Sequence, residues 1–196
     1  SVSAQHYAFV VHAFVDFIQK EAGDEYQFTL RETETQNILE DITNYKSEIG
    51  VLYLNDFNRK VMEKLFKEKN LVFTPLFTAQ PHVFLSTQNP LAEKESITLE
   101  ELEDYPYLSY EQGEENSFYF SEEILSTMEH KKSIKVSDCA TIFNLMVGLN
   151  GYTISSGIIS SKLNDDKIVA VPLDVEDTME LGILQHDQRK LSKEAG

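Results

Sequence analysis

The sequence predicts an α/β protein, because strand-like and helix-like patterns alternate along most of its 196 residues. Residues 49–54, IGVLYL, form an apolar run of strand length, which is typical of a strand covered on both faces of a sheet. Residues 35–46, TQNILEDITNYK, carry apolar side chains at helical spacing. Since 41% of the residues are hydrophobic, the chain can bury a core, and we expect a largely parallel sheet with helices on its faces.

The chain is expected to open with a helix over residues 6–20 that stops before Gly23. Residues 26–32 then alternate like a strand. The apolar face of this helix should turn toward the core and consists of Tyr7, Val10, Val11, Phe14 and Ile18.

The next helix, over residues 35–46, has Thr35 in the N-cap position, where a hydroxyl oxygen can accept a backbone hydrogen bond. The strand at residues 49–54 follows it, and residues 59–68 and 71–77 add a further helix and a further strand. The buried face of the helix over residues 35–46 should consist of Ile38, Leu39 and Ile42.

The strand at residues 71–77 is followed by another at residues 82–87, with no helix between them. Parallel neighbours in one sheet need a crossover of about a dozen residues. The two strands therefore form either a hairpin or a step from one lobe to another, with a hinge at residues 78–81.

The second half of the chain continues the alternation. Thr98 is expected to cap a very short helix, Pro106 should lie near the start of a strand, and Asn150-Gly151 should stop a helix. The expected helices cover residues 98–102, 117–130 and 139–150, and the expected strands cover residues 105–110, 133–138, 151–156, 167–173 and 179–186.

Charge argues against nucleic acid as a direct partner of this chain. The net charge is −16, with 33 acidic residues against 17 basic ones, whereas phosphate binding needs a basic face. Lys131, Lys132 and Lys135 are best explained as a solvated edge. No apolar run approaches a membrane span, and no signal peptide is recognisable. A single cysteine, Cys139, favours a reducing compartment, so we expect a cytoplasmic protein.

Patterns of catalytic or metal-binding residues are weak. The histidines at positions 6, 12, 82, 130 and 186 lack metal-ligand spacing, and one cysteine cannot build a thiolate zinc site. Cys139 is expected to be a buried, inert thiol. We therefore expect no cofactor, no metal and no enzymatic activity.

Three runs in residues 86–112 stand in a distinctive order: NPLA at residues 89–92, ITLEEL at 97–102 and YPYL at 105–108. This order resembles the start of the second lobe in the effector-binding domains of LysR-type transcriptional regulators. Asn89 stands where that family usually has histidine.

Further runs follow in the family's order, namely residues 32–38, 47–52 and 146–155, so the resemblance spans nearly the whole chain. Thr33 takes the place of a usual glycine. Residues 1–7, SVSAQHY, are most similar to the CysB-like regulators of sulfur and amino-acid metabolism, in which small hydroxyl residues occupy this turn.

The resemblance implies two Rossmann-like α/β lobes of the type II periplasmic-binding-protein fold, joined by two hinge crossings. Lobe I would comprise residues 1–78 plus 175–196, and lobe II residues 79–174. A small-molecule effector would bind between the lobes. The resemblance further implies self-association as a dimer or tetramer, and contact with DNA only through a winged helix-turn-helix domain that this chain lacks.

The start of a helix carries unpaired N–H groups and partial positive charge, which suits small anions or zwitterions between two such lobes. Three helix starts and one loop are candidates. The helix starts are at residues 1–6, 33–35 and 137–141, and the loop is at residues 110–113. At the first start, Ser1 and Ser3 could donate hydroxyls, although an ordinary N-cap explains them too. At the third, Asp138 is most simply a cap. The expected ligand-binding residues are Ser1, Ser3, Ala4, Thr33, Glu34, Thr35, Gln112, Gly113 and Asp138.

The sequence thus favours an effector-sensing domain of a LysR-type regulator. Acidic residues near Gln112, namely Glu114 and Glu115, favour an amino acid or other zwitterion over a simple anion. One alternative is an extracytoplasmic solute-binding protein of an importer. Another is a lyase or dehydratase of the same fold, which would need an acid/base pair that the sequence does not indicate.

Overall fold

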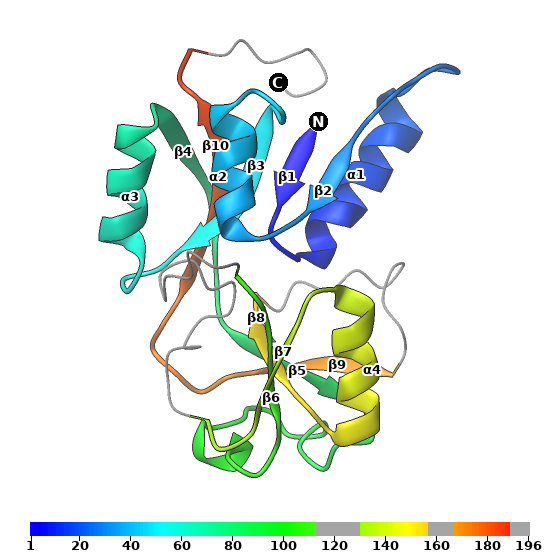
Figure 1. Ribbon diagram of the computed structural model, residues 1–196. Helices are drawn as coiled ribbons and strands as arrows, with labels where there is room; N and C mark the ends of the chain where they lie inside the picture. Colours follow the sequence, from blue (N-terminus) through cyan, green and yellow to red (C-terminus); the bar gives the residue numbers. More distant parts are fainter. Residues whose placement is uncertain (113–129, 157–166, 189–196) are drawn as a thin grey trace.

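The computed structural model describes residues 1–112, 130–156 and 167–188, which form two lobes (Figure 1). Lobe I, in the upper half of Figure 1, contains the N-terminal part of the chain and the last described strand. Lobe II, in the lower half, contains the middle of the chain. None of the helices in the described parts is long and apolar enough to cross a membrane.

The sheet of lobe I has five strands in the order β2-β1-β3-β10-β4. Strands β1, β2, β3 and β4 run in the same direction, and β10 inserts antiparallel between β3 and β4. The expectation of a largely parallel sheet therefore holds for lobe I apart from β10, whose antiparallel insertion makes the sheet mixed. The strands are β1 (Val2–Ala4), β2 (Leu30–Glu32), β3 (Ile49–Leu54), β4 (Leu71–Ala79) and β10 (Met179–His186).

Helices α2 (Thr35–Thr43) and α3 (Arg59–Glu68) pack on one face of this sheet. Ile38, Leu39 and Ile42 are buried there, as the helical pattern predicts. Successive side chains of a strand point to opposite faces, so alternate residues of β3 enter different clusters. The strand is buried on both sides, as its apolar run indicates.

Helix α1 (Ala8–Glu21) lies on the opposite face of the sheet, where Val10 belongs to the same buried cluster as Val51 and Tyr53 of β3. Of its expected apolar face only Tyr7 and Val10 are buried, while Val11, Phe14 and Ile18 stay partly exposed. Phe14 and Phe17 meet the ring of Phe28, and a pocket lies between the helix and the sheet.

Lobe II contains a three-stranded antiparallel sheet in the order β8-β5-β9 and a parallel pair, β6-β7. A bridge between Tyr107 and Tyr152 joins the two. Helix α4 (Cys139–Leu149) packs against β5 and β6. The strands are β5 (His82–Ser86), β6 (Tyr107–Tyr110), β7 (Ser133–Val136), β8 (Thr153–Ser155) and β9 (Ile168–Pro172).

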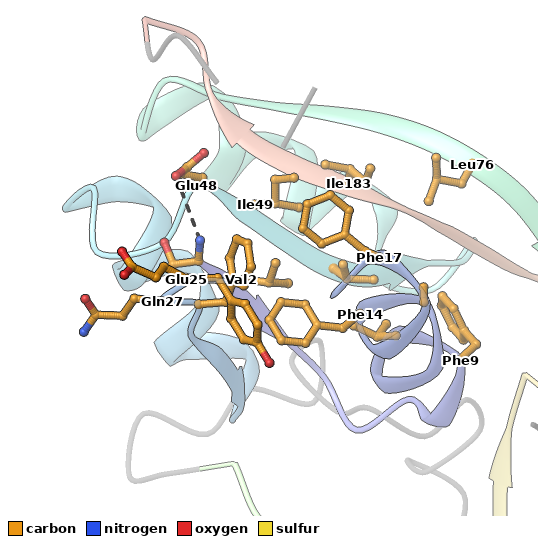
Figure 2. A pocket seen from close by; sticks show the side chains of 16 residues that line it. Val2, Phe9, Phe14, Phe17, Glu25, Gln27, Glu48, Ile49, Leu76 and Ile183 are labelled. Carbon is orange, nitrogen blue, oxygen red and sulfur yellow. Dashed lines mark ion pairs between the residues drawn. The ribbon is translucent and has the colours of Figure 1, made fainter. Parts of the chain in front are cut away.

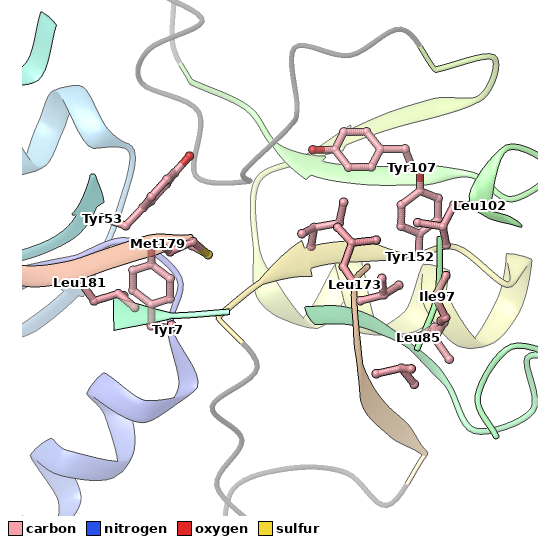
Figure 3. Packing of buried hydrophobic residues seen from close by; sticks show 14 of the residues in the cluster. Tyr7, Tyr53, Leu85, Ile97, Leu102, Tyr107, Tyr152, Leu173, Met179 and Leu181 are labelled. Carbon is pink, nitrogen blue, oxygen red and sulfur yellow. The ribbon is translucent and has the colours of Figure 1, made fainter. Parts of the chain in front are cut away.

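The chain crosses between the lobes twice, from β4 to β5 and from β9 to β10 (Figure 1). Strand β4 pairs with β10, and β5 pairs with β8 and β9, so the step between lobes is confirmed and the hairpin is not. The largest buried cluster draws on both lobes, with Tyr7 and Met179 on one side and Leu85 and Ile97 on the other (Figure 3).

The long step over residues 86–112 stabilises the second crossing. Ile97 is fully buried, and its backbone exchanges hydrogen bonds with Pro172 and Asp174 on either side of Leu173. A one-turn 3-10 helix, Glu100–Leu102, follows it. Thr98 and Glu101 bond reciprocally in the pattern of a capping box, so Thr98 does serve this helix start, although the N-cap position itself is Leu99.

Several element ends differ from the sequence expectation. The strand expected at residues 26–32 is confined to Leu30–Glu32, and the helix expected to residue 46 ends at Thr43. Glu34, not Thr35, is the N-cap of α2. Asn150 does stop α4, in the left-handed conformation. The helix expected at residues 117–130 lies, but for its last residue, outside the described residues.

Close packing of α2 on the sheet makes Gly50 a sensitive position. A Cβ there would lie 2.9 Å from Ile38 Cγ2 and 3.3 Å from Leu184 Cβ. We expect Gly50→Ala to lower the free energy of unfolding by about 1–3 kcal/mol. Gly148→Ala, in α4, meets nothing within 4 Å and should raise it by up to about 1 kcal/mol. Urea unfolding of both variants measures the two free energies of unfolding. Equal stability of the two variants would contradict the close contact of α2 with Gly50.

Candidate functional site

Helix starts and strand ends from both lobes meet where the lobes face one another. Strands β1 and β2 end, and helices α1 and α2 begin, at the side of lobe I that faces lobe II (Figure 1). Strand β6 ends and α4 begins at the side of lobe II that faces lobe I. We call this region the inter-lobe junction and define it by Gln5, His6, Thr35, Tyr110, Gln112 and Asp138.

A hydrogen bond between the lobes occupies the start of α2. The backbone N–H of Thr35 donates to Oε1 of Gln112 over 3.0 Å. Both residues are buried, with relative exposures of 1% and 7%. The first N–H groups of a helix have no acceptor within the helix and carry partial positive charge. A carboxamide oxygen of lobe II thus fills the place in lobe I that suits an anion.

Gln5 supports this helix start from inside lobe I. Its Nε2 donates to Thr35 Oγ1 over 2.8 Å, and its Oε1 accepts from the Tyr7 hydroxyl at 2.9 Å and from the backbone N–H of Tyr53 at 3.3 Å. Gln5 is 2% exposed. Because its amide is used at both ends, the hydroxyl of Thr35 is held in one orientation.

A second contact between the lobes lies beside the first. The rings of His6 and Tyr110 stack with their centroids 3.8 Å apart and their planes at 8°. His6 precedes α1, and Tyr110 ends β6. Two aromatic faces at this distance bury apolar area and fix the relative position of the two elements.

Asp138 caps α4, as the sequence indicates. Its carboxylate accepts from Thr141 N–H at 2.7 Å and from the Thr141 hydroxyl at 3.0 Å. These hydrogen bonds lower the pKa of Asp138, and the charge of His6 adds a weaker contribution in the same direction. The carboxylate is exposed, so it forms the solvent-facing edge of the junction.

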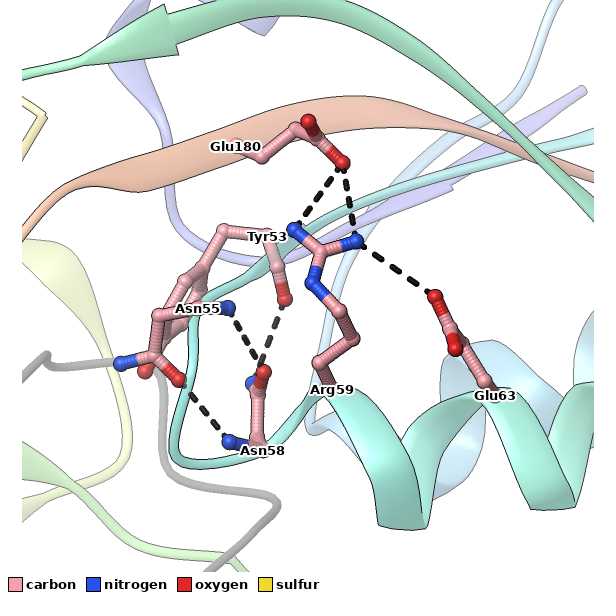
Figure 4. A network of polar contacts seen from close by, with 6 residues as sticks. All are labelled: Tyr53, Asn55, Asn58, Arg59, Glu63 and Glu180. Carbon is pink, nitrogen blue, oxygen red and sulfur yellow. Dashed lines mark hydrogen bonds and ion pairs between the residues drawn. The ribbon is translucent and has the colours of Figure 1, made fainter.

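The turn after β3 is the third loop at this side of lobe I (Figure 1), and Figure 4 shows its polar contacts. The side chains of Asn55 and Asn58 accept reciprocally from each other's backbone N–H groups, at 2.8 and 2.9 Å. Arg59 contacts Glu180 of β10 at 3.2 Å. The loop is therefore fixed to the strand that enters lobe I from the second crossing.

The structure does not bring all the expected ligand-binding residues to the junction. Ser1 and Ser3 do not lie in a turn between a strand and a helix; they precede and form part of β1 itself. Ser3 is fully buried and donates to Asp41 Oδ2 over 2.7 Å, with Ser47 Oγ also at 2.7 Å. Ser1 bonds weakly to the carbonyl of Lys46 at 3.4 Å. Both hydroxyls are engaged away from the junction.

Other expected residues do surround it. The Ala4 carbonyl accepts from Thr33 N–H at 2.9 Å, which ties the end of β1 to the start of α2. Glu34 is the N-cap and partly exposed, and it makes no side-chain capping bond. Thr35 and Gln112 form the central contact. Gly113 lies outside the described residues. Ligand contact by each of these residues stays a prediction.

The residues expected from the sequence to bind a ligand did not include Gln5, His6 or Tyr110. A buried glutamine and a histidine directly before a helix could have indicated side chains that serve its N-terminus. No local pattern could have paired His6 with Tyr110, since the two are more than a hundred positions apart. Among the described residues, no group of three or more His, Cys, Asp or Glu could hold a metal ion.

The model of the LysR substrate binding domain matches residues 8–195. The chain belongs to this family. It is an effector-binding domain of the LysR type with the type II periplasmic-binding-protein fold, so the sequence resemblance is confirmed at that level. No protein among the curated sequences matches the chain significantly.

Solved LysR-type structures share the fold. The effector-binding domain of QuiR in complex with shikimate is 16% identical, with a TM-score of 0.64 over 99% of this chain and 90% of that one. The reduced OxyR regulatory domain from Pseudomonas aeruginosa is 18% identical, with a TM-score of 0.66 over 96% and 88%. The LysR-family regulator HinK from Pseudomonas aeruginosa is 16% identical, with a TM-score of 0.64. The match covers 99% of this chain and 65% of HinK.

The buried hydrogen bonds of Ser3 with Asp41 and Ser47 predict that Ser3 stabilises the fold. We expect Ser3→Ala to lower the free energy of unfolding by about 1–3 kcal/mol, because the buried Asp41 carboxylate loses a hydrogen-bond donor. Ser1→Ala, which removes only the weak bond to Lys46, should change it by less than about 0.5 kcal/mol. Urea unfolding separates the two, and equal stability of the two variants would show that the hydroxyl of Ser3 is free for another role.

Proposed function

We propose that this domain senses a small zwitterionic metabolite, related to amino acids, that binds between its lobes and controls a transcription regulator. The observation that carries the proposal is the Gln112 carboxamide oxygen on the N–H of Thr35. An uncharged oxygen there occupies a place in which a carboxylate would bind more strongly, because charge-assisted hydrogen bonds exceed neutral ones. QuiR, a structural relative, is described in complex with shikimate, which also carries a carboxylate.

In this proposal the effector carboxylate replaces Gln112 at the start of α2. Thr35 N–H then donates to the ligand, and the Thr35 hydroxyl, fixed by Gln5, orients it. The partly exposed carboxylate of Glu34 pairs with the ligand's ammonium group. The carboxylate of a zwitterion interacts favourably with the helix dipole, and its ammonium group interacts favourably with the strongly acidic protein. A simple anion makes only the first of these interactions.

Replacement of Gln112 would couple binding to lobe geometry. The Thr35–Gln112 bond and the His6–Tyr110 stack both join lobe I to lobe II. A ligand shifts an equilibrium only by its differential affinity for the two states. An effector that breaks the first contact therefore changes how strongly the lobes hold one relative orientation, and DNA-binding domains outside this chain would read that change.

The sulfur-metabolism subtype rests on residues 1–7 alone. Since Ser1 and Ser3 lie away from the inter-lobe junction, their hydroxyls give no support to a sulfur-containing effector over any other amino acid. The proposal therefore commits to the zwitterionic class. Family membership favours a regulator over an importer's solute-binding protein. Family membership also favours ligand sensing over catalysis and a cytoplasmic location of the protein.

Gln112 variants test the proposal once a ligand is found by thermal shift. The panel contains O-acetylserine, cysteine, methionine, homocysteine, sulfate and the other common amino acids. We expect Gln112→Ala to tighten binding about fivefold, since a hydrogen bond of about 1 kcal/mol no longer competes. Gln112→Glu should weaken it, because its own carboxylate occupies the helix start and repels the ligand. Isothermal titration calorimetry measures both.

Equal weakening by both variants would identify Gln112 as a ligand contact and contradict its role as a competitor. Binding that neither variant alters would move the site away from α2. Sulfate binding without amino-acid binding would contradict the zwitterionic class.

We further propose that the domain self-associates through the outer side of α4. Val147 and Leu149, near the C-terminal end of α4, are 45% and 52% exposed, so both leave apolar area that a second copy can cover. We expect Leu149→Asp to yield monomers in sedimentation equilibrium under conditions where the unaltered chain forms dimers. Asn37→Asp, which adds the same charge on the exposed face of α2, should leave the dimer intact. A Leu149→Asp variant that still forms dimers would place the interface elsewhere.

A further inference from the structure

A pocket of about 580 Å³ lies in lobe I, between α1 and the sheet face that α2 and α3 do not cover (Figure 2). It is distinct from the inter-lobe junction, since none of the residues that define the junction lines it. Pockets that take small ligands have volumes of about 300–1,000 Å³ and mostly apolar walls. The size of this pocket falls within that range.

Aromatic rings form one wall of the pocket. Phe9, Phe14 and Phe17 of α1 project toward the sheet, as Figure 2 shows. The ring of Phe28 meets those of Phe14 and Phe17 edge-on at 6.1 and 5.5 Å. Tyr26 stacks on Phe28 at 5.6 Å and is itself 59% exposed. Contacts among the rings keep α1 off the sheet, and the space between them stays open.

Aliphatic side chains of the sheet form the opposite wall. Val2, Ile49 and Ile183 line it from β1, β3 and β10, and Leu76 of β4 lies at the end near Phe9. Leu76 is 51% exposed. Large apolar residues left uncovered around a hollow of this size indicate a surface that a flat apolar group can cover.

The two ends of the pocket differ in charge. Glu25 and Glu48 lie at the end away from Phe9 and Leu76 (Figure 2). Among the residues that the structure describes, no lysine or arginine lines the pocket. Glu48 is partly exposed, so a cation at this end of the pocket would meet two carboxylates.

We propose that this pocket is a second ligand site, which binds a compound with one aromatic ring and an amine on a short chain. The ring lies between the phenylalanines of α1 and the sheet, where aromatic pairs gain more than area burial alone. The amine contacts Glu48 and Glu25. The proposal does not depend on what binds between the lobes.

A matched series of probes tests the two halves of the site. 2-Phenylethylamine, 2-phenylethanol and 3-phenylpropionate share a ring and a short chain but carry a positive, a neutral and a negative group. We expect the amine to bind about fivefold more tightly than the alcohol, as for a partly exposed ion pair, and the acid to bind least. Amide proton–nitrogen spectra should show shifts at residues 9–17 and at Ile183, with Thr35 and the side chain of Gln112 unchanged.

Two variants locate the site without removing core side chains. Ala13 lines the pocket from an exposed position on α1, so Ala13→Trp should fill the space and reduce affinity for the amine about tenfold or more. Glu48→Gln should reduce the preference for the amine over the alcohol, because only the carboxylate of Glu25 then remains. Glu40→Gln, which removes an exposed carboxylate of α2 outside the pocket, is the control and should change neither value. Urea unfolding confirms that each variant is folded.

The proposal is overturned if folded protein binds none of the three probes, or binds the acid as well as the amine. Shifts confined to the inter-lobe junction would overturn it too, because the probe would then have entered the other site. If the probes do not bind and Ala13→Trp changes the oligomeric state, the pocket is an interface between copies of the chain, which equally excludes the proposal.

Discussion

The buried N–H of Thr35 must find an acceptor, because the first turn of a helix cannot supply one and a buried unpaired donor costs about 1–3 kcal/mol. In this chain the acceptor is Oε1 of Gln112, which comes from the other lobe. Satisfying one helix start therefore also joins the two halves of the molecule. Gln5 extends the constraint inward by bonding the hydroxyl of Thr35, the hydroxyl of Tyr7 and the backbone of β3.

Around this bond the rest of the inter-lobe junction follows from where strands end. The strand order of lobe I brings the starts of α1 and α2 side by side, and His6 and Thr35 thereby face the end of β6. Tyr110 and Gln112 sit two positions apart, so the stack and the hydrogen bond restrain the same short segment. Helix α1 belongs to both regions, since it begins beside His6 and carries the rings of the second pocket.

Much of the fold could be predicted because buried helices and strands have characteristic patterns of apolar residues over short stretches of sequence. The apolar run of β3 and the missing helix between β4 and β5 follow from patterns within a few residues, and the cap formed by Asp138 needs only Thr141 three positions on. What failed depends on distant partners. The insertion of β10 between β3 and β4 has no local signal, and the hydroxyl of Ser3 binds a residue 38 positions away. The Thr35–Gln112 bond spans 77 positions.

The central claim is that the carboxamide of Gln112 holds the place of a ligand carboxylate on the start of α2. The most direct measurement is the amide proton–nitrogen spectrum, with Thr35 and the Gln112 side chain assigned, during titration with an amino acid that binds. The account predicts that the Thr35 signal moves downfield as a charged acceptor replaces a neutral one, while the Gln112 side-chain signals move to solvent-exposed positions. Saturation of the protein with both sets of signals unchanged would contradict it.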